Sequence, residues 1–485
     1  MAIRDLYTPY AAQEEAVARA VASTKPCIAI IGPPGSGKSM VNLLLAEYYP
    51  KSVILCVTKQ LQRQYEDYKI PDVKSVSGKN NYPCIAGYAA DCEAANDRNL
   101  CRSCSYKVDL SCPYWAAEAE ADEAPIAVTN YSYYFMQTYF GNALHNRHSV
   151  IFDEAHEFDR TMLGLMDVEW NRNYDERLLG FKLPRVFNRQ QWQEAAKLAI
   201  SKLGKDKESK KLLTKFALTE IAFSQEDAWI FEMEGRLITI RPKWVSPDWT
   251  KGMIENAHKV ILSSATFYPP YVGSLLGFRE DQIETIEMPS TFPLEYRPFI
   301  FKKVARVSTH KGTSEEALEL DKLVLEIDRI MAEHHAEKGL LHTVSYKLRD
   351  EILKRTRFPG RFMTHDSSSR QAVIDAFRKA PAGTILASPS MTTGVDFPYD
   401  QLNYQIIAKL PVPSLGDKRV VIRKEERKEI HDAEVRNTLI QMYGRAMRSK
   451  DDFGLTYCLD TWAHYFYQNN MAKFPRYVRE AVITL

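Results

Sequence analysis

The glycine-rich stretch from Gly32 to Ser39 constrains the fold of this chain more than any other feature. An apolar, β-branched run from Cys27 to Ile31 comes directly before it, and helix-forming residues come after it. A strand, a tight turn and a helix in this order point backbone N–H groups at a polyphosphate. Lys38 is expected to reach the β- and γ-phosphates, and Ser39 to place its hydroxyl on Mg²⁺. The predicted phosphate-binding residues are Gly32, Pro33, Pro34, Gly35, Ser36, Gly37, Lys38 and Ser39.

A second apolar strand, predicted at 149–152, ends in the acidic box Asp153-Glu154-Ala155-His156. The carboxyl ends of parallel strands are where α/β folds bind their ligands. Asp153 can therefore hold Mg²⁺, and Glu154 can orient or deprotonate the water that attacks the γ-phosphate. His156 is open to two interpretations: an ordinary polar residue after a strand, or a relay between the nucleotide and a second substrate.

The C-terminal half carries a cationic motif that runs from Gln441 to Arg448. Arg445 and Arg448 are three residues apart, which places both guanidinium groups on one face of a helix. Arginines that a second domain delivers to the γ-phosphate accelerate hydrolysis by about 10³- to 10⁵-fold. The alternative interpretation is a solvated basic face. Gly444 argues against it, because glycine costs helix stability unless close approach requires it.

The motifs follow one another along nearly the whole chain, and the chain resembles the superfamily 2 helicases of the XPD/DinG type, which are iron–sulfur helicases. The resemblance implies that Gln13 reads adenine, that Gln441 joins the hydrolytic residues and that Asp396 contacts the nucleotide. Asp396 lies in a motif where Thr393 departs from the acidic residue of many relatives. The remaining motif-like segments are 57–61, 263–266 and 341–346.

The resemblance implies an α/β fold with two RecA-like P-loop motor domains, in which the first carries an iron–sulfur cluster insert and a short Arch-like insert. A chain of 485 residues is too long for one core, which agrees with this division. Within the Arch-like insert, the pattern predicts a helix at 190–203, a lysine-rich break at 205–211 and two strands around a turn at Glu234-Gly235. The expected domains are 1–78, 113–158 and 252–270 for motor domain 1, 79–112 for the cluster domain, 159–251 for the Arch-like insert and 271–485 for motor domain 2.

Five of the eight cysteines crowd into one segment between the phosphate loop and the acidic box. Thiolate ligands suit either an iron–sulfur cluster or structural zinc, and their spacing does not decide between the two. A disulfide framework is disfavoured, because no secretory signal opens the chain. The resemblance favours a [4Fe–4S] cluster on Cys84, Cys101, Cys104 and Cys112, which leaves Cys92 as a spare.

The net charge of +2 means that any DNA path is local rather than a general basic surface. Around the cysteines, an aromatic residue and cations can stack on a strand and follow its backbone. The alternative is a set of solvated side chains beside a metal site. The DNA-binding candidates are Lys79, Tyr82, Arg102 and Lys107, together with Thr58 in the segment 57–61.

The resemblance implies an ATP-dependent helicase that moves 5′ to 3′ on single-stranded DNA and uses ATP, Mg²⁺ and a [4Fe–4S] cluster. Its expected partners are single-stranded DNA, junctions of single and double strands, and DNA/RNA hybrids. We expect a monomer in the cytoplasm of a bacterial or phage-infected cell. No apolar run is long enough to predict a membrane span. Two alternatives remain: an ATPase that remodels protein–DNA complexes without unwinding, and an adaptor with a decayed motor, against which the intact Lys38, Glu154 and Arg445 argue.

Overall fold

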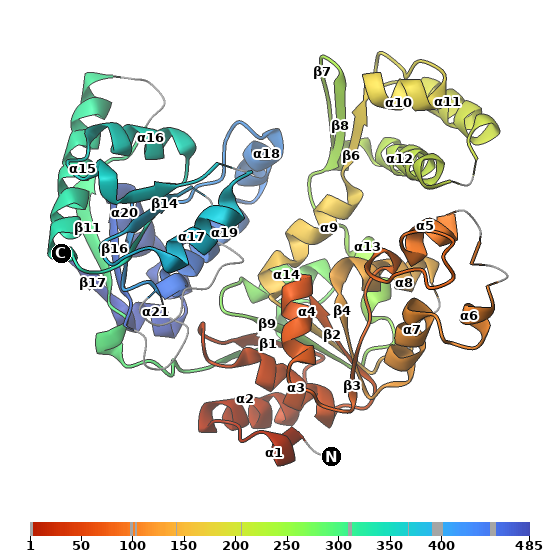
Figure 1. The fold of residues 1–485 in the computed structure, drawn as a ribbon, viewed down its shortest axis with the longest axis horizontal. Coiled ribbons are helices and arrows are strands. Elements are labelled where there is room, and N and C mark those ends of the chain that lie inside the picture. The colour runs from red at the N-terminus through yellow and green to blue at the C-terminus, as the bar shows by residue number, and fades with distance from the viewer. Residues whose placement is uncertain are drawn as a thin grey trace.

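The computed structural model describes residues 3–97, 100–101, 104–141, 143–204, 206–308, 313–366, 368–389, 401–446 and 453–485. In these ranges the chain forms two parallel β-sheets, each flanked by helices, and a smaller antiparallel sheet (Figure 1). No helix in the same ranges combines the length and the apolar character that crossing a bilayer requires.

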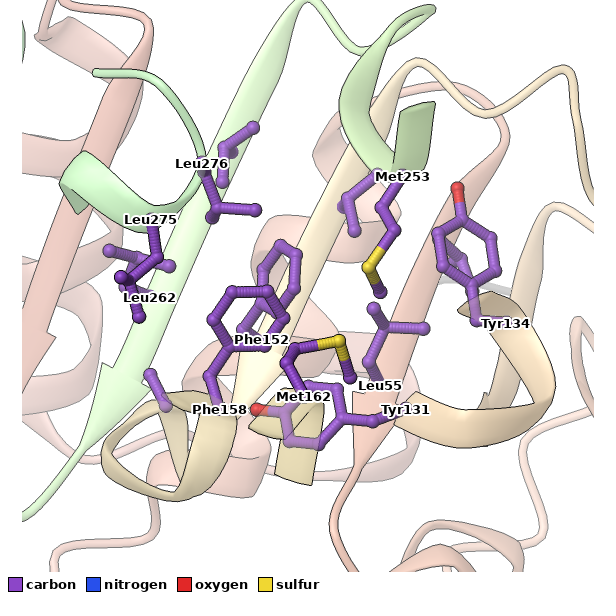
Figure 2. Packing of buried hydrophobic residues seen from close by; sticks show 14 of the residues in the cluster. Leu55, Tyr131, Tyr134, Phe152, Phe158, Met162, Met253, Leu262, Leu275 and Leu276 are labelled. Atoms are coloured by element: carbon purple, nitrogen blue, oxygen red, sulfur yellow. The ribbon is translucent and has the colours of Figure 1, made fainter. Parts of the chain in front are cut away.

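The first parallel sheet is buried on both faces. Cys27, Ala29 and Ile31 of its strand β1 belong to one apolar cluster, whereas Ile28 and Ile30 belong to another on the opposite face. Such two-sided burial explains why β1 is a continuous apolar run rather than an alternating one. Figure 2 shows one of the two clusters, in which Phe152 and Phe158 pack together. The strand order is β10 (Ile283–Glu287), β1 (Cys27–Ile31), β9 (Lys259–Ser264), β5 (Ser149–Asp153), β2 (Ser52–Cys56), β4 (Ile126–Asn130) and β3 (Val73–Ser75).

The edge strand β10 corrects the expected boundary between the motor domains at residues 270 and 271. β10 pairs in parallel with β1, with Cys27 opposite Ile283. The connecting helix α14 (Pro269–Leu275) also packs into the first apolar cluster. The first domain therefore extends at least to Glu287. The boundary was placed too early because β10 is a short edge strand in which only Ile283 and Ile286 are buried, so its sequence lacks the period-two pattern of a half-buried strand.

The second parallel sheet forms the core of the C-terminal domain. Neighbouring residues of its strand β16 again point to opposite faces, because Cys458 joins one cluster while Tyr457 and Leu459 join another. The strand order is β13 (Phe362–Thr364), β14 (Ile385–Ser388), β12 (Gly339–His342), β15 (Tyr404–Ile407), β16 (Leu455–Asp460), β11 (Phe299–Ala305) and β17 (Val482–Thr484).

The insert between β5 and β9 has a core of its own, in which Trp170, Trp192 and Phe216 meet. Gly235 has a φ of 58° at the turn between its two long strands, as the sequence predicts. The predicted lysine-rich break at 205–211 is wrong from residue 207 onward, because a helix capped by Asp206 begins there. The elements are β6 (Val168–Asn171), β8 (Leu237–Pro242), β7 (Trp229–Glu234), α10 (Arg172–Leu179), α11 (Arg189–Lys202) and α12 (Lys207–Ser224).

The remaining helices surround the two parallel sheets and the cysteine segment. In the first domain they are α1 (Ile3–Leu6), α2 (Ala11–Ala22), α3 (Lys38–Tyr48), α4 (Lys59–Glu66), α7 (Pro113–Glu123), α8 (Tyr131–Phe140), α9 (Phe158–Met166) and α13 (Pro247–Thr250), with α5 (Cys92–Asp97) and α6 (Ser105–Val108) among the cysteines. In the second domain they are α15 (Ser314–Glu333), α16 (Tyr346–Arg355), α17 (Arg370–Lys379), α18 (Lys418–Glu426), α19 (Lys428–Tyr443), α20 (Thr461–Asn470) and α21 (Arg476–Ala481).

Helix α18 joins the second domain to the base of the insert (Figure 1). Arg423 donates to Asp159 of α9 at 2.6 Å, and its guanidinium lies 4.5 Å from the centroid of the Trp244 ring. We call this interface the α18 contact. It comprises Asp417, Arg419, Arg423 and Glu426 on one side and Asp159, Asp167, Arg241, Lys243 and Trp244 on the other.

Candidate nucleotide-binding site

The phosphate loop lies between β1 and α3. Gly35 and Gly37 have φ angles of 72° and 71°, a region of backbone space that favours glycine. At Gly32, an added Cβ would lie 2.7 Å from Cγ of Lys38, so the lysine stem occupies the space that a side chain would need. Lys38 Nζ donates to the Gly32 carbonyl at 3.2 Å. The lysine therefore lies along the loop that would hold the phosphates.

Gln13 is bonded to the phosphate loop at the nitrogen end of its amide. Its Nε2 donates to the carbonyls of Ser36 and Gly37 at 3.1 and 3.2 Å, and its Oε1 accepts from the Tyr10 N–H at 2.8 Å. The side chain is also buried. These contacts place Gln13 where it supports the shape of the loop, and its contact with adenine stays a prediction.

Asp153 lies at the end of β5, where two buried tyrosines contact it. The Tyr65 hydroxyl donates to Oδ2 of its carboxylate at 2.9 Å, and the Tyr131 hydroxyl donates to its backbone carbonyl at 2.8 Å. Burial and the neighbouring Glu154 raise the pKa of Asp153 to about 6, although Lys38 and the Tyr65 hydroxyl act in the opposite direction. A cation bound at this carboxylate would stabilise its charged form.

Glu154 has a φ of 53°, which is uncommon for a residue that is not glycine. The backbone there turns into a short helical segment that carries His156. His156 Nδ1 lies 2.8 Å from Ser264 Oγ and 3.3 Å from Glu154. Burial lowers the pKa of His156, but its ion pairs with Glu154 and Glu157 outweigh this effect and raise the pKa to about 9.

His156 also contacts the second domain, because its Nε2 meets the side-chain amide of Gln441 near the end of α19. These contacts connect the acidic box to the second domain, and the relay role of His156 stays a prediction. Ser264, the other partner of His156, lies in the segment 263–266, and the likeness of this segment to a helicase motif was its only signal in the sequence. His156 and Gln441 lie 285 positions apart in the chain.

Gly444 lets the two domains approach at the phosphate loop. A Cβ on Gly444 would lie 2.7 Å from Cγ of Pro34, so a larger residue would push the domains apart. α19 ends at Tyr443, and Arg445 lies in the 3₁₀ turn that follows. That Arg445 and Arg448 share one helical face stays a prediction. Arg448 and Asp396 lie outside the described residues.

A cavity of about 560 Å³ lies between the two domains. This volume is within the range of about 300–1,000 Å³ that is common for small-molecule sites. The first domain contributes the phosphate loop, the acidic box and Thr58, and the second contributes residues from the end of α19. The lining residues with predicted roles are Pro34, Gly35, Gly37, Lys38, Ser39, Thr58, Asp153, Glu154, His156, Gln441 and Arg445.

The cysteine segment brings thiols near one another. Cys92 Sγ lies 3.7 Å from Cys112 Sγ, and Cys101 Sγ lies 4.0 Å from the Cys92 carbonyl oxygen. Burial and the Cys112 thiol raise the pKa of Cys92 to about 12, and burial, Cys104 and Cys84 raise that of Cys101. Across the described ranges, no three metal-binding side chains converge closely enough to hold an ion. Cys92, the predicted spare, thus lies among the predicted ligands.

Two of the DNA-binding candidates, Lys79 and Lys107, lie over the ring of Trp115, a residue that was not among the candidates predicted from the sequence. The ammonium groups of Lys79 and Lys107 lie 4.8 and 4.0 Å from the centroid of the Trp115 ring. The Tyr82 hydroxyl accepts the Ser77 N–H at 3.1 Å. Trp115 follows the last cysteine of the segment by three residues, and this position was the available signal. Arg102 lies outside the described residues.

Thr58 lies at the start of α4, beside the nucleotide cavity. Its Oγ1 accepts the Leu61 N–H at 3.2 Å and so caps the start of α4. Thr58 also lines the cavity that contains Lys38 and Asp153. The described contacts connect it to the nucleotide cavity, and a contact with DNA stays a prediction.

Two parallel sheets with a phosphate-loop cavity between their domains define a two-domain RecA-like P-loop fold. Residues 328–481 match the family described as "Helicase C-terminal domain". The chain is similar to the solved structure of an XPD helicase, with a TM-score of 0.66, 15% identity, and coverage of 98% of this chain and 99% of the other. It is similar to Xpd4 from S. tokodaii, with a TM-score of 0.59, 14% identity and the same coverage. A comparison with curated protein sequences gives no match.

The chain therefore has a fold like that of the XPD helicases, as the sequence predicts, and residues 328–481 match a helicase C-terminal domain. The α/β class with two RecA-like domains is confirmed as well.

Proposed function

We propose that this chain is an ATP-dependent DNA helicase that translocates 5′ to 3′ on single-stranded DNA and unwinds duplex DNA or DNA/RNA hybrids. The observation that carries the proposal is the cavity between the domains, because one domain lines it with Lys38, Asp153 and Glu154 and the other with Gln441 and Arg445. A nucleotide that contacts both sides would favour closure, and its hydrolysis would release it. Repeated closure and opening can then move a strand across both domains.

Each residue has a distinct part in the proposed hydrolysis. Lys38 and the N–H groups of the phosphate loop bind the β- and γ-phosphates, while Ser39 and Asp153 bind Mg²⁺. Glu154 orients the attacking water and accepts its proton. Gln441, Arg445 and Arg448 come from the second domain, and the two arginines stabilise the charge that develops on the γ-phosphate. Because Gln441 contacts His156, this side of the cavity is connected directly to the acidic box.

The cysteine segment is proposed to hold a [4Fe–4S] cluster through Cys84, Cys101, Cys104 and Cys112. When bound, the cluster supplies iron–thiolate bonds that cross-link the segment. The donor set fits this chemistry, since every candidate ligand is a thiol. The raised pKa values of Cys92 and Cys101 arise partly from neighbouring thiols, and a bound cation would remove this repulsion. Zinc is the competing metal.

Elemental analysis of anaerobically purified protein tests the cluster. We expect about four irons per chain and little zinc, with a brown colour that serine at any one of the four proposed ligands removes. Cys92→Ser is the matched control, because Cys92 lies in the same segment and is expected to keep the metal. A colourless protein with one zinc, or metal loss in Cys92→Ser, would contradict the assignment.

Single-stranded DNA, and its junctions with duplex, are the proposed partners. The supporting feature is Trp115 with Lys79 and Lys107 over its ring, since aromatic rings stack on bases and cations track the backbone. The insert between β5 and β9 is proposed to act as a short Arch that guides the strand.

Strand displacement tests the proposed activity directly. The wild-type chain should hydrolyse ATP faster with single-stranded DNA and displace a strand from a duplex with a 5′ overhang, but not from one with a 3′ overhang. Glu154→Gln should bind ATP and displace no strand. Hydrolysis and movement without strand displacement would support a remodelling ATPase instead, and a chain without hydrolysis would support a decayed motor.

A further inference from the structure

A buried tyrosine connects helix α4 to the acidic box. The Tyr65 hydroxyl donates to Oδ2 of Asp153 at 2.9 Å and lies 2.9 Å from Asn42 Nδ2, which donates to it. Tyr65 and Asn42 are 1% and 0% exposed, so water does not compete for these bonds. With the Asn42 amide as donor, the tyrosine proton is directed at the carboxylate.

Helix α4 holds Tyr65 in place through a second buried side chain one turn earlier. Gln62 Nε2 donates to the Val76 carbonyl at 3.1 Å, and Gln62 Oε1 accepts the Ser77 hydroxyl at 3.0 Å. Both Gln62 and Tyr65 are anchored, so the hydroxyl is fixed relative to the sheet before any ligand binds. A hydrogen bond from a fixed neighbouring side chain orients a carboxylate that binds a metal.

Tyr131 provides an internal comparison at the same residue. Its hydroxyl is equally buried and donates to the backbone carbonyl of Asp153 at 2.8 Å. The two tyrosines thus contact different atoms of one residue. The bond from Tyr131 stabilises the end of β5, whereas the bond from Tyr65 acts on the carboxylate itself.

We propose that Tyr65 is a positioning residue, which holds the Asp153 carboxylate in the orientation that binds the magnesium ion of Mg·ATP. This inference rests on the proposed nucleotide function of the cavity. It assigns to α4 a role in the nucleotide site that the helicase motifs do not carry, because Tyr65 lies beyond the motif-like segment 57–61.

The experiment measures binding of a fluorescent ATP analogue to the full chain while Mg²⁺ is titrated, without nucleic acid and without turnover. Tyr65→Phe should need about 10-fold more Mg²⁺ for half-maximal tightening of the analogue. Its affinity for the analogue in EDTA should stay within about twofold of wild type, because the phosphate loop is unchanged. Tyr131→Phe is the matched control and should keep the wild-type Mg²⁺ requirement.

A second variant, Asn42→Leu, removes the donor that orients the tyrosine proton and should shift the Mg²⁺ requirement in the same direction by a smaller factor. It also provides the test if Tyr65→Phe does not fold. Wild-type Mg²⁺ dependence in Tyr65→Phe, or an equal shift in Tyr131→Phe, would overturn the assignment alone. A wild-type chain whose nucleotide binding ignores Mg²⁺ would overturn the proposed function together with the assignment.

Discussion

Two of the places where the domains meet have opposite character: the nucleotide cavity and the α18 contact. At the cavity, Gln441 contacts His156 and Gly444 lies close to Pro34, beside a volume of about 560 Å³. In the α18 contact, by contrast, charged side chains of the two sides form ion pairs. The buried Arg423 guanidinium lies between Asp159 at 2.6 Å and Glu434 at 2.9 Å.

The nucleotide cavity has room for a ligand and can respond to its binding, whereas the ion pairs of the α18 contact fix the position of α18 against the insert. Buried ion pairs lose hydration, so they add little net stability, but removal of one partner leaves a costly unpaired charge. The α18 contact also buries Asp159 Oδ1 and Arg423 Nε without a hydrogen-bond partner among the described residues. We therefore expect substitutions at the cavity to change turnover and substitutions at the α18 contact to change stability.

The largest effect is expected at the cavity. Arg445→Ala should lower DNA-stimulated ATP turnover by about 10³-fold or more while ATP affinity changes little, since an arginine finger acts in the transition state. Phosphate-release kinetics and equilibrium nucleotide binding measure the two quantities. The matched control is Arg160→Ala, which lines the same cavity from the first domain with a largely exposed side chain and should keep near wild-type turnover. Equal losses of affinity and rate in Arg445→Ala would place this arginine in ground-state binding.

The next effect is expected at the α18 contact. Arg423→Ala should lower the free energy of unfolding by about 3–5 kcal/mol, because it leaves the Asp159 carboxylate buried without its partner. Denaturant unfolding of the full chain gives this quantity. Arg427→Ala removes an exposed arginine whose guanidinium lies 4.8 Å from the centroid of the same Trp244 ring, and should cost much less. Similar losses in the two variants would mean that the ion pair does not set the stability of this contact.

His156, at the cavity, should make the stability of the folded chain depend on pH. Its folded pKa of about 9 is above its ordinary value of 6.5, so protonation stabilises the folded chain. This contribution is fully present below pH 6.5 and is lost as the pH rises through 9. The melting temperature of wild type should therefore fall toward that of His156→Gln between pH 7 and pH 10. Parallel melting curves for the two proteins over this range would place the histidine in its neutral form.

The smallest effect is expected at the rim of the α18 contact. Trp244 Nε1 donates to Glu426 at 2.6 Å in an exposed position. Glu426→Gln keeps an acceptor there but removes the charge, so the free energy of unfolding should fall by no more than about 1 kcal/mol. A loss as large as that of Arg423→Ala would show that the rim and the centre of the contact act as one unit.

The sequence predicted those parts of the site that follow directly from a strand. Lys38 comes after β1 and Asp153 ends β5, and local patterns identify such positions because parallel strands end at one edge of a sheet. Glycine is required at position 444 because a Cβ there would collide with Pro34, which lies 410 positions away in the sequence. By contrast, the spacing of Arg445 and Arg448 assumed a helix that ends at Tyr443.

Features that depend on distant contacts could not be predicted in the same way. Tyr65 contacts Asp153, which lies 88 positions further along the chain, and no local pattern in the sequence reveals this contact. β10 is a short edge strand without a period-two apolar pattern, and only its pairing with β1 assigns it to the first sheet. The choice of four cysteines out of five also depends on three-dimensional contacts, and here Cys92 lies beside Cys112.

The insert between β5 and β9 has consequences for how chains of this fold can diverge. Its tryptophan-rich core is separate from both parallel sheets, and β5 still pairs directly with β9 although the insert interrupts the chain between them. Its length can therefore change over evolution without a shift in the register of the strands that carry the acidic box. The constraint on such change lies at the base of the insert, where Asp167 and Arg241 must keep their partners on the second domain.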